Sequence, residues 1–183
     1  GGFRRGANMG ILRVDHPDIL DFIRLKSNPE EMTHFNLSVG VTDEFLQAVR
    51  LDQPHLLLDP HTGTRTPLKD WSARAVWDLI ARRAWESGEP GVLFLDRINE
   101  FNPTPQLGIM EATNPCGEMP LLPFEACNLG SIHLAHFIRD RNVDWPRLKE
   151  TIRLAVRFLD NVIDVNRSPL PPIEKGVKGN RKV

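Results

Sequence analysis

The sequence predicts an α/β fold in which short apolar strands alternate with amphipathic helices. Three observations support this prediction. Apolar residues at alternate positions over 35–41 indicate a strand. An amphipathic pattern over 72–87, closed by Gly88, indicates a helix. The continuous apolar run 91–95 then indicates a strand that is buried on both faces. A strand, a helix and a strand in this order favour a sheet with a parallel component.

The N-terminal part of the chain predicts a loop, a strand and a helix. Residues 1–10 are rich in Gly and Arg, which is typical of a loop, and Arg4 suits the recognition of phosphates or bases. A solvated basic turn is the competing interpretation of Arg4. Residues 11–14 have alternating apolar side chains and indicate a short strand, whereas residues 18–26 have the apolar spacing of a helix.

The middle of the chain predicts two helices separated by a hairpin. The Thr-Asp pair at 42–43 is expected to cap a helix over 43–50. The Pro-rich stretch 51–69 predicts an excursion that contains a short hairpin. In the helix that follows, Trp77 and Trp85 are interpreted as core or interface anchors rather than cofactor contacts.

The C-terminal half predicts fewer regular elements. Residues 96–113 contain two prolines and predict a loop. A strand is expected to begin near Cys127. A long amphipathic helix is expected to begin at 144–146 and to end before the Pro-rich stretch 169–172, because proline cannot continue a helix.

The composition argues against several classes of protein. A net charge of −1 gives no reason to propose a nucleic-acid or membrane surface. The apolar runs are shorter than the roughly 20 residues that a membrane span needs. The two cysteines are too few for a disulfide scaffold, and no signal-peptide pattern is present, which favours a reducing, cytoplasmic setting. Because the chain opens on Gly1 rather than a methionine and closes on Val183 with no obvious stop, we expect an internal segment of a longer protein.

The candidate reaction centre is the pentapeptide Asn114-Pro115-Cys116-Gly117-Glu118. In an extended segment the amide, thiol and carboxylate side chains would point to one face, and the Pro and Gly residues would shape the backbone between them. One-electron chemistry at the sulfur could then be combined with a carboxylate base and a hydrogen-bonding amide. An ordinary buried thiol is the competing interpretation.

The second cysteine, Cys127, leaves three interpretations open. It could be a buried thiol, a disulfide partner of Cys116, or a redox thiol whose partner lies elsewhere. A metal site is not expected, because two isolated cysteines lack the spacing of metal ligands and His133 and His136 do not complete such a site.

Two motifs in this region identify a family. Asn114-Pro-Cys-Gly-Glu118, followed by Ala126-Cys-Asn-Leu-Gly-Ser-Ile132, resembles the catalytic subunit of ribonucleotide reductase, and most of all its adenosylcobalamin-dependent class II form. The resemblance implies that residues 1–183 are an internal segment of the catalytic barrel domain, incomplete at both ends. It also implies part of a ten-stranded α/β barrel with a central finger loop carrying Cys116. The resemblance extends over nearly the whole chain, through further motifs at residues 1–10, 16–19, 36–43 and 176–183.

The resemblance implies a role for each site residue. Cys116 matches the thiyl-radical position that removes the ribose 3′-hydrogen, and Glu118 matches the base that takes the 3′-hydroxyl proton. Asn114 matches the residue that hydrogen-bonds the ribose and assists loss of the 2′-hydroxyl group. Cys127 matches one of the two reducing thiols, which disfavours a disulfide with Cys116. Arg4 lies in a loop that matches the one relaying effector identity, and it is expected to touch the substrate.

The implied activity is reduction of ribonucleoside di- or triphosphates to 2′-deoxyribonucleotides for DNA synthesis, with adenosylcobalamin as cofactor. The implied partners are the ribonucleotide, a nucleotide effector and a thioredoxin- or glutaredoxin-type reductant; monomer and homodimer stay open. The cofactor-binding residues and the second reducing cysteine are expected outside this segment, which alone should be inactive. Two alternatives remain: a class I catalytic subunit that needs a metal-radical partner subunit, and a nucleotide-binding or assembly module without catalysis.

Overall fold

The computed structural model describes residues 6–28 and 30–183. The chain divides into two compact units, Gly1–Leu122 and Pro123–Val183. Arg4, which was expected to touch the substrate, lies outside the described residues, as does the first half of the loop expected over 1–10.

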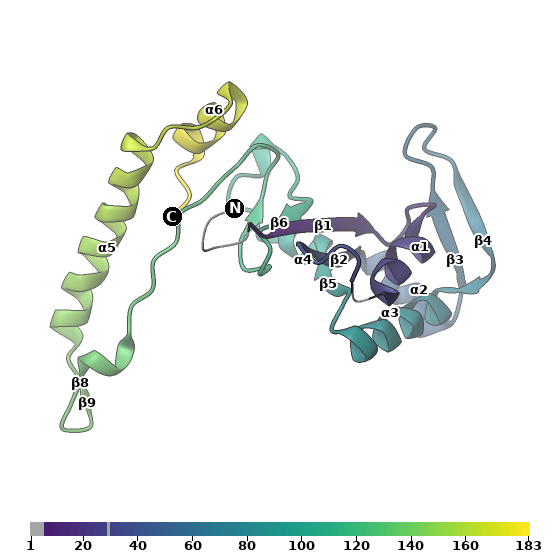
Figure 1. The fold of residues 1–183 in the computed structure, drawn as a ribbon, viewed down its shortest axis with the longest axis horizontal. Helices are drawn as coiled ribbons and strands as arrows, with labels where there is room; N and C mark the ends of the chain where they lie inside the picture. Colours follow the sequence, from purple (N-terminus) through teal and green to yellow (C-terminus); the bar gives the residue numbers. More distant parts are fainter. Residues whose placement is uncertain (1–5, 29) are drawn as a thin grey trace. The chain divides into compact units, whose positions relative to one another are not determined.

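A parallel sheet organises the first unit. It consists of β1 (Asn8–Arg13), β2 (Phe35–Val41) and β5 (Gly91–Phe94), with β2 in the centre (Figure 1). The α/β prediction is therefore confirmed, and so are the bounds of the strand over 35–41. The first strand begins earlier than expected, because Asn8 already pairs with Phe35 in the ladder with β2.

The run 91–95 was expected to be a strand buried on both faces, and this expectation is wrong. β5 lies at one side of the described sheet, and its last residue, Phe94, is 46% exposed. Leu95, which is buried, already belongs to the short helix α4 (Leu95–Glu100). An apolar run can therefore serve a strand and the first turn of a helix, and hydropathy alone does not separate the two.

Three helices pack against one face of the sheet. They are α1 (Ile19–Arg24), which continues as a 3₁₀ turn over Leu25–Ser27, α2 (Asp43–Leu51) and α3 (Ala73–Ser87). The side-chain oxygens of Thr42 and Ser72 accept hydrogen bonds from the first turns of α2 and α3, which confirms the expected capping of α2 by Thr42. The shared core consists of Val14, Ile19, Ile23, Val39, Val41, Phe45, Val49, Ala73, Val76 and Ile80.

The two tryptophans of α3 have different environments. Trp77 packs against this core, with its ring centroid 6.4 Å from that of Phe45. Trp85 is 86% exposed, so it does not anchor the core of this chain. The buried face of the helix consists of Ala73, Val76 and Ile80.

The opposite face of the sheet carries small side chains along β2. Asn36, Ser38 and Gly40 alternate with Leu37, Val39 and Val41; Asn36 is exposed, and the other five residues are buried. A Cβ atom added at Gly40 would lie 2.6 Å from Cδ1 of Leu95, so this position accepts no side chain without movement of Leu95. The small residues therefore allow other segments to approach this face closely.

A hairpin lies between α2 and α3, as the Pro-rich stretch predicted. It consists of the antiparallel strands β3 (Pro54–Leu58) and β4 (Arg65–Ser72), and it is longer than expected. At its tip, the carboxylate of Asp59 accepts hydrogen bonds from the backbone amides of His61 and Thr62 at 2.8 and 3.0 Å. These bonds lower the pKa of Asp59 below its usual range.

The expectation of a loop over 96–113 is wrong in part. This stretch contains most of α4, a 3₁₀ turn over Pro105–Leu107 and the strand β6 (Ala112–Thr113), which pairs with β7 (Pro120–Leu121). These elements are too short for periodicity to reveal them.

The second unit has two α-helices, a 3₁₀ turn over Leu134–Phe137 and a small hairpin, β8 (Ile138–Arg139) and β9 (Asn142–Val143). The long helix α5 (Trp145–Val165) begins as expected, with the Asp144 carboxylate accepting a hydrogen bond from the Arg147 amide at 3.1 Å. It is followed by the shorter α6 (Pro171–Asn180), which was not expected. The expected strand near Cys127 is also wrong, because residues 122–133 form no regular element.

The Pro-rich stretch 169–172 lies between α5 and α6. Helix α5 ends before it, as expected, but α6 then begins within it, with Pro at its first helical positions, which was not expected. The fixed φ of proline suits the first turn of a helix, where its missing N–H group costs no hydrogen bond.

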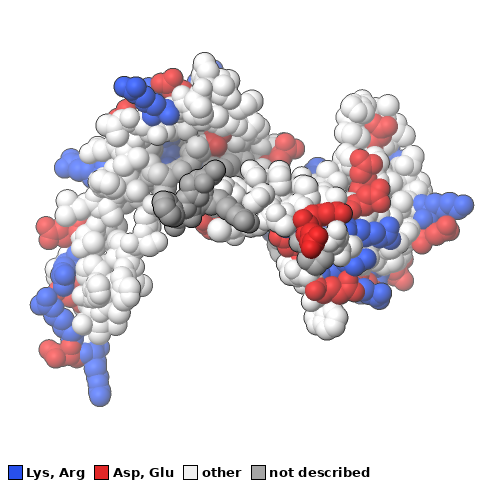
Figure 2. Space-filling model, viewed as in Figure 1, with Lys and Arg blue, Asp and Glu red and all other residues white. Residues whose placement is uncertain are grey.

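The surface of the chain mixes both signs of charge. On the face shown in Figure 2, Lys and Arg side chains lie among Asp and Glu side chains. Among the described residues, each helix is too short or too polar to cross a membrane.

Candidate active site

The pentapeptide with Cys116 forms the turn of the β6–β7 hairpin. The Gly117 amide donates a hydrogen bond to the Asn114 carbonyl oxygen at 3.0 Å, and Gly117 has a φ of +83°. The sequence analysis considered an extended segment, but the structure shows a segment that folds back on itself. Pro115 at the start of the turn and a glycine in the left-handed region favour this geometry. Asn114, Cys116 and Glu118 share one short turn rather than one face of a strand.

The three candidate side chains differ in exposure. Cys116 and Glu118 are exposed, whereas Asn114 is half-buried. The Oδ1 atom of Asn114 accepts a hydrogen bond from the Met119 amide at 3.0 Å. This bond orients the carboxamide so that its Nδ2 group is the end available to donate to a ligand.

The turn is attached to the sheet by a residue that the sequence analysis did not select. Nδ2 of Asn36, in β2, donates a hydrogen bond to the carbonyl oxygen of Pro115 at 2.7 Å. Asn36 lies on the face of β2 that carries the small side chains, opposite the helices. An asparagine, which is depleted in strands, within an otherwise apolar and small-residue strand was the signal that could have indicated it.

A second asparagine fixes the segment that leads into the hairpin. The side chain of Asn99, in α4, donates to the Met110 carbonyl oxygen at 2.9 Å and accepts from the Met110 amide at 2.8 Å. Met110 itself is 4% exposed. This two-point contact determines where the chain enters β6.

Cys127 belongs to the second unit. It is half-buried, and both cysteines are thiols in the structure. It lines a cavity of about 150 Å³ together with residues of α5 and α6, among them Ile163 and Val177. The neighbouring Asn128 donates a hydrogen bond from Nδ2 to the Leu159 carbonyl oxygen at 3.1 Å, which attaches this segment to α5.

Helix α6 also contacts the Cys127 segment closely. A Cβ atom added at Gly176 would lie 2.9 Å from the backbone oxygen of Phe124. Beside this contact, the carboxylate of Glu125 binds Lys182 at 2.6 Å and accepts a hydrogen bond from Asn180. The irregular segment before Cys127 is therefore held by specific contacts rather than by a strand ladder.

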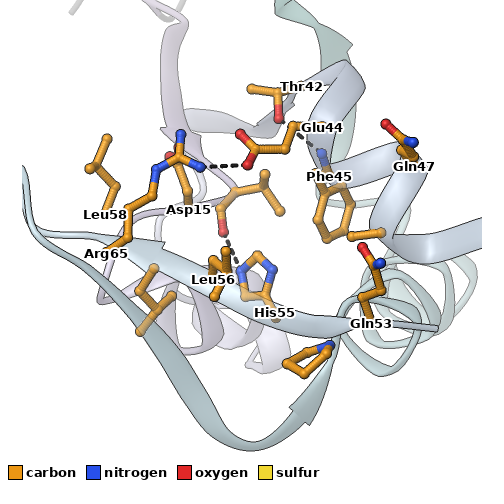
Figure 3. Close-up of a pocket in the computed structure, with 14 residues that line it drawn as sticks. Asp15, Thr42, Glu44, Phe45, Gln47, Gln53, His55, Leu56, Leu58 and Arg65 are labelled. Atoms are coloured by element: carbon orange, nitrogen blue, oxygen red, sulfur yellow. Dashed lines mark hydrogen bonds and ion pairs between the residues drawn. The ribbon is translucent and has the colours of Figure 1, made fainter. Parts of the chain in front are cut away.

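A separate cavity of about 210 Å³ lies between α2 and the β3–β4 hairpin (Figure 3). His55 is buried in its wall, and its Nε2 atom lies 2.8 Å from the Val14 carbonyl oxygen. Burial lowers the pKa of His55, and the hydrogen bond to Val14 opposes this shift. Glu44 and Arg65 form an ion pair at one side of the cavity. It contains none of the residues expected at the reaction centre.

Within the described part of the chain, no three His, Cys, Asp or Glu side chains are grouped as metal ligands would be.

Comparison with known proteins identifies the fold. The family model described as "Ribonucleotide reductase, barrel domain" matches residues 1–183. The vitamin B12-dependent ribonucleoside-diphosphate reductase of Mycobacterium tuberculosis (strain CDC 1551 / Oshkosh) is 52% identical over the whole chain, which covers 26% of that protein. The protein of the same name from Thermoplasma acidophilum is 48% identical, again over the whole chain, which covers 24% of it. The vitamin B12-dependent ribonucleotide reductase of Rhodopirellula baltica is 32% identical over 96% of the chain, which covers 19% of it. The chain thus spans about a quarter of the length of its two most similar relatives named here.

Proposed function

The chain belongs to the ribonucleotide reductase barrel-domain family, and from this membership we propose that the protein reduces ribonucleotides to 2′-deoxyribonucleotides by thiyl-radical chemistry. The observation that carries the proposal is the turn Asn114–Glu118. It presents an exposed thiol and an exposed carboxylate beside an oriented carboxamide. We place residues 1–183 inside the catalytic barrel, with the β6–β7 hairpin as its finger loop. The three parallel strands of the first unit would then be part of the barrel wall.

Each side chain of the turn has a chemical role in this proposal. The Cys116 thiyl radical removes the hydrogen atom from C3′ of the ribose while the Glu118 carboxylate takes the 3′-hydroxyl proton. Nδ2 of Asn114 donates a hydrogen bond to a ribose oxygen and assists departure of the 2′-hydroxyl group as water. The Cys116 thiol finally returns a hydrogen atom to C3′, so this residue is not consumed.

The electrons come from a pair of thiols. Cys127 and a second cysteine supply two electrons and two protons to the substrate and end as a disulfide, which balances the loss of water. A thioredoxin- or glutaredoxin-type dithiol then reduces this disulfide by thiol–disulfide exchange. Such a cycle needs a reducing compartment, and we therefore propose a cytoplasmic location.

The proposed cofactor is adenosylcobalamin, which supplies one-electron chemistry when bound. The feature of this chain that fits it is Cys116, because an exposed thiol at the tip of a turn can yield a hydrogen atom to a radical brought close to it. We assign no described residue to holding the cofactor. The names of the relatives, which include vitamin B12, favour this cofactor over a metal-radical partner subunit. They also favour a ribonucleoside diphosphate as substrate, and we leave the effector and the oligomeric state unassigned.

The decisive experiment uses the complete gene product with adenosylcobalamin, a dithiol and a ribonucleoside diphosphate. The expected result is formation of a deoxyribonucleotide by the wild type and none by Cys116→Ser. Product only after addition of a partner subunit would identify the class I form. No product under either condition would support a nucleotide-binding or assembly module without catalysis.

A further inference from the structure

The hydrogen bond between Asn36 and Pro115 assigns a role to a residue outside the cysteine motifs. We propose that Asn36 is a positioning residue that fixes the Cys116 turn against the parallel sheet; this inference rests on the proposed function. The two residues are 79 positions apart in the sequence, and Nδ2 of Asn36 lies 2.7 Å from the Pro115 carbonyl oxygen. Pro115 immediately precedes Cys116, so a bond to its carbonyl group fixes the plane of the peptide that leads to the cysteine.

Within the described part of the chain, further hydrogen bonds between residues of the hairpin determine the shape of the turn. The Gly117 amide bonds to the Asn114 carbonyl oxygen, and the Met119 amide bonds to the Asn114 side chain. Both contacts begin and end within the hairpin. The Asn36 bond, in contrast, joins the turn to another element and so determines where the thiol lies relative to the sheet.

Asn36 lies in the central strand of the parallel sheet, β2. Asn36 pairs with Met9 of β1, and β5 pairs with β2 from Ser38 onwards. The residue after Asn36, Leu37, is 4% exposed. On the face that carries Asn36, the next residues are Ser38, which is 6% exposed, and Gly40, against which the side chain of Leu95 packs. A functional group held by a strand and supported by a buried neighbour is positioned more accurately than one held by a loop alone.

The chemistry explains why such a bond would matter. Hydrogen-atom transfer requires the sulfur and the ribose C3′ to be in near contact, and a displacement of about 1 Å can reduce the rate about 100-fold. The carboxamide of Asn36 touches the backbone and is not assigned to the substrate. Its loss should therefore reduce kcat and leave KM unchanged.

The test compares Asn36→Asp, Asn36→Ala and a matched control in the complete gene product. Asn36→Asp is nearly isosteric and replaces the donor by an acceptor, whereas Asn36→Ala removes the side chain. The control is Asn142→Ala, which removes a carboxamide that donates to the Asp140 carbonyl oxygen in the β8–β9 hairpin. We expect kcat to fall about 10- to 100-fold in both Asn36 variants, with KM and the thermal midpoint unchanged, and no change in the control.

A second measurement does not depend on turnover. The rate of alkylation of Cys116 by iodoacetamide, measured by peptide mass spectrometry without cofactor or substrate, should rise in both Asn36 variants. The rate at Cys127 should stay at the wild-type value, which excludes general loosening of the chain. Wild-type kcat and Cys116 alkylation in Asn36→Asp would overturn the inference, and so would a parallel rise at both cysteines. If instead Cys116→Ser kept full turnover, the proposed function would fail, while the alkylation rates would still decide whether Asn36 holds the turn.

Discussion

The carboxylate of Glu125 and the ammonium group of Lys182 form a buried ion pair, 2.6 Å apart, two residues before Cys127. The Glu125 side chain is 1% exposed and that of Lys182 is 13% exposed. The side chain of Asn180 donates a second hydrogen bond to the same carboxylate. Asn180, at the end of α6, and Lys182 thus bind the segment that carries a proposed reducing thiol.

Glu125→Ala should destabilise the second unit strongly. Removal of one partner from a buried ion pair costs about 3–5 kcal/mol, because the remaining charge stays in a poorly solvated site. Denaturant unfolding of the complete gene product, followed by hydrogen exchange in α6, would measure this loss. The matched control is Glu174→Ala, which removes the exposed i,i+4 pair with Lys178 on the same helix. It should cost no more than about 0.5 kcal/mol, and equal losses in the two variants would contradict the burial argument.

Glu118→Gln should reduce kcat with little change in KM. The substitution keeps the size of the exposed side chain but removes the proton acceptor, and loss of a general base typically costs a factor of about 10² to 10⁴. Steady-state assays of deoxyribonucleotide formation would measure it. Glu111→Gln, an exposed carboxylate just before β6, is the control and should behave like the wild type. Similar activity of Glu118→Gln and the wild type would remove Glu118 from the mechanism.

Cys127→Ser should separate hydrogen-atom transfer from reduction. Without Cys127 the thiol pair cannot form its disulfide, so dithiol-dependent turnover should stop. Cys116 would still take the 3′-hydrogen, and the resulting S–H group exchanges with solvent, so a nucleotide with tritium at C3′ should continue to release label into water. Cys116→Ser should lose both activities. Full turnover in Cys127→Ser would show that another residue supplies the electrons.

Stability should fall below neutral pH through His55. Burial lowers its pKa in the folded chain below the ordinary value of 6.5, so the unfolded state binds a proton first as the pH falls. The stabilisation is therefore complete above the ordinary pKa and is lost progressively below it, by at most about 1.4 kcal/mol per pH unit for one proton. Denaturant midpoints between pH 8 and pH 5 would measure the slope.

The matched variants for this measurement are His55→Gln and His34→Gln. The first removes the buried imidazole and should flatten the slope. The second removes an exposed histidine and should keep the wild-type slope. A slope that is unchanged in His55→Gln would assign the pH dependence to other groups.

Long elements with a clear period were predictable from the sequence. β2, α2, α3 and the start of α5 were expected close to their observed positions, because their buried side chains recur at the spacing of a strand or a helix. The short β6 and β7 were not, since strands of two residues carry no period. The prediction of a strand near Cys127 was wrong. Side-chain contacts to α5 and α6, such as that of Asn128 with Leu159, hold this segment in place of the backbone hydrogen bonds of a sheet.

The sequence by itself determined the chemical inventory of the candidate site. It placed a thiol, a carboxylate and a carboxamide within five residues, and the surrounding motifs indicated the family that the comparisons then showed. Only the tertiary structure decided how these groups are held. The turn at Asn114–Gly117, the bond from Asn36 to Pro115 and the burial of Glu125 with Lys182 depend on backbone geometry or on contacts between distant residues. Local hydrophobic periodicity reports which face of an element is buried, but it contains no information about which distant residue will meet that face.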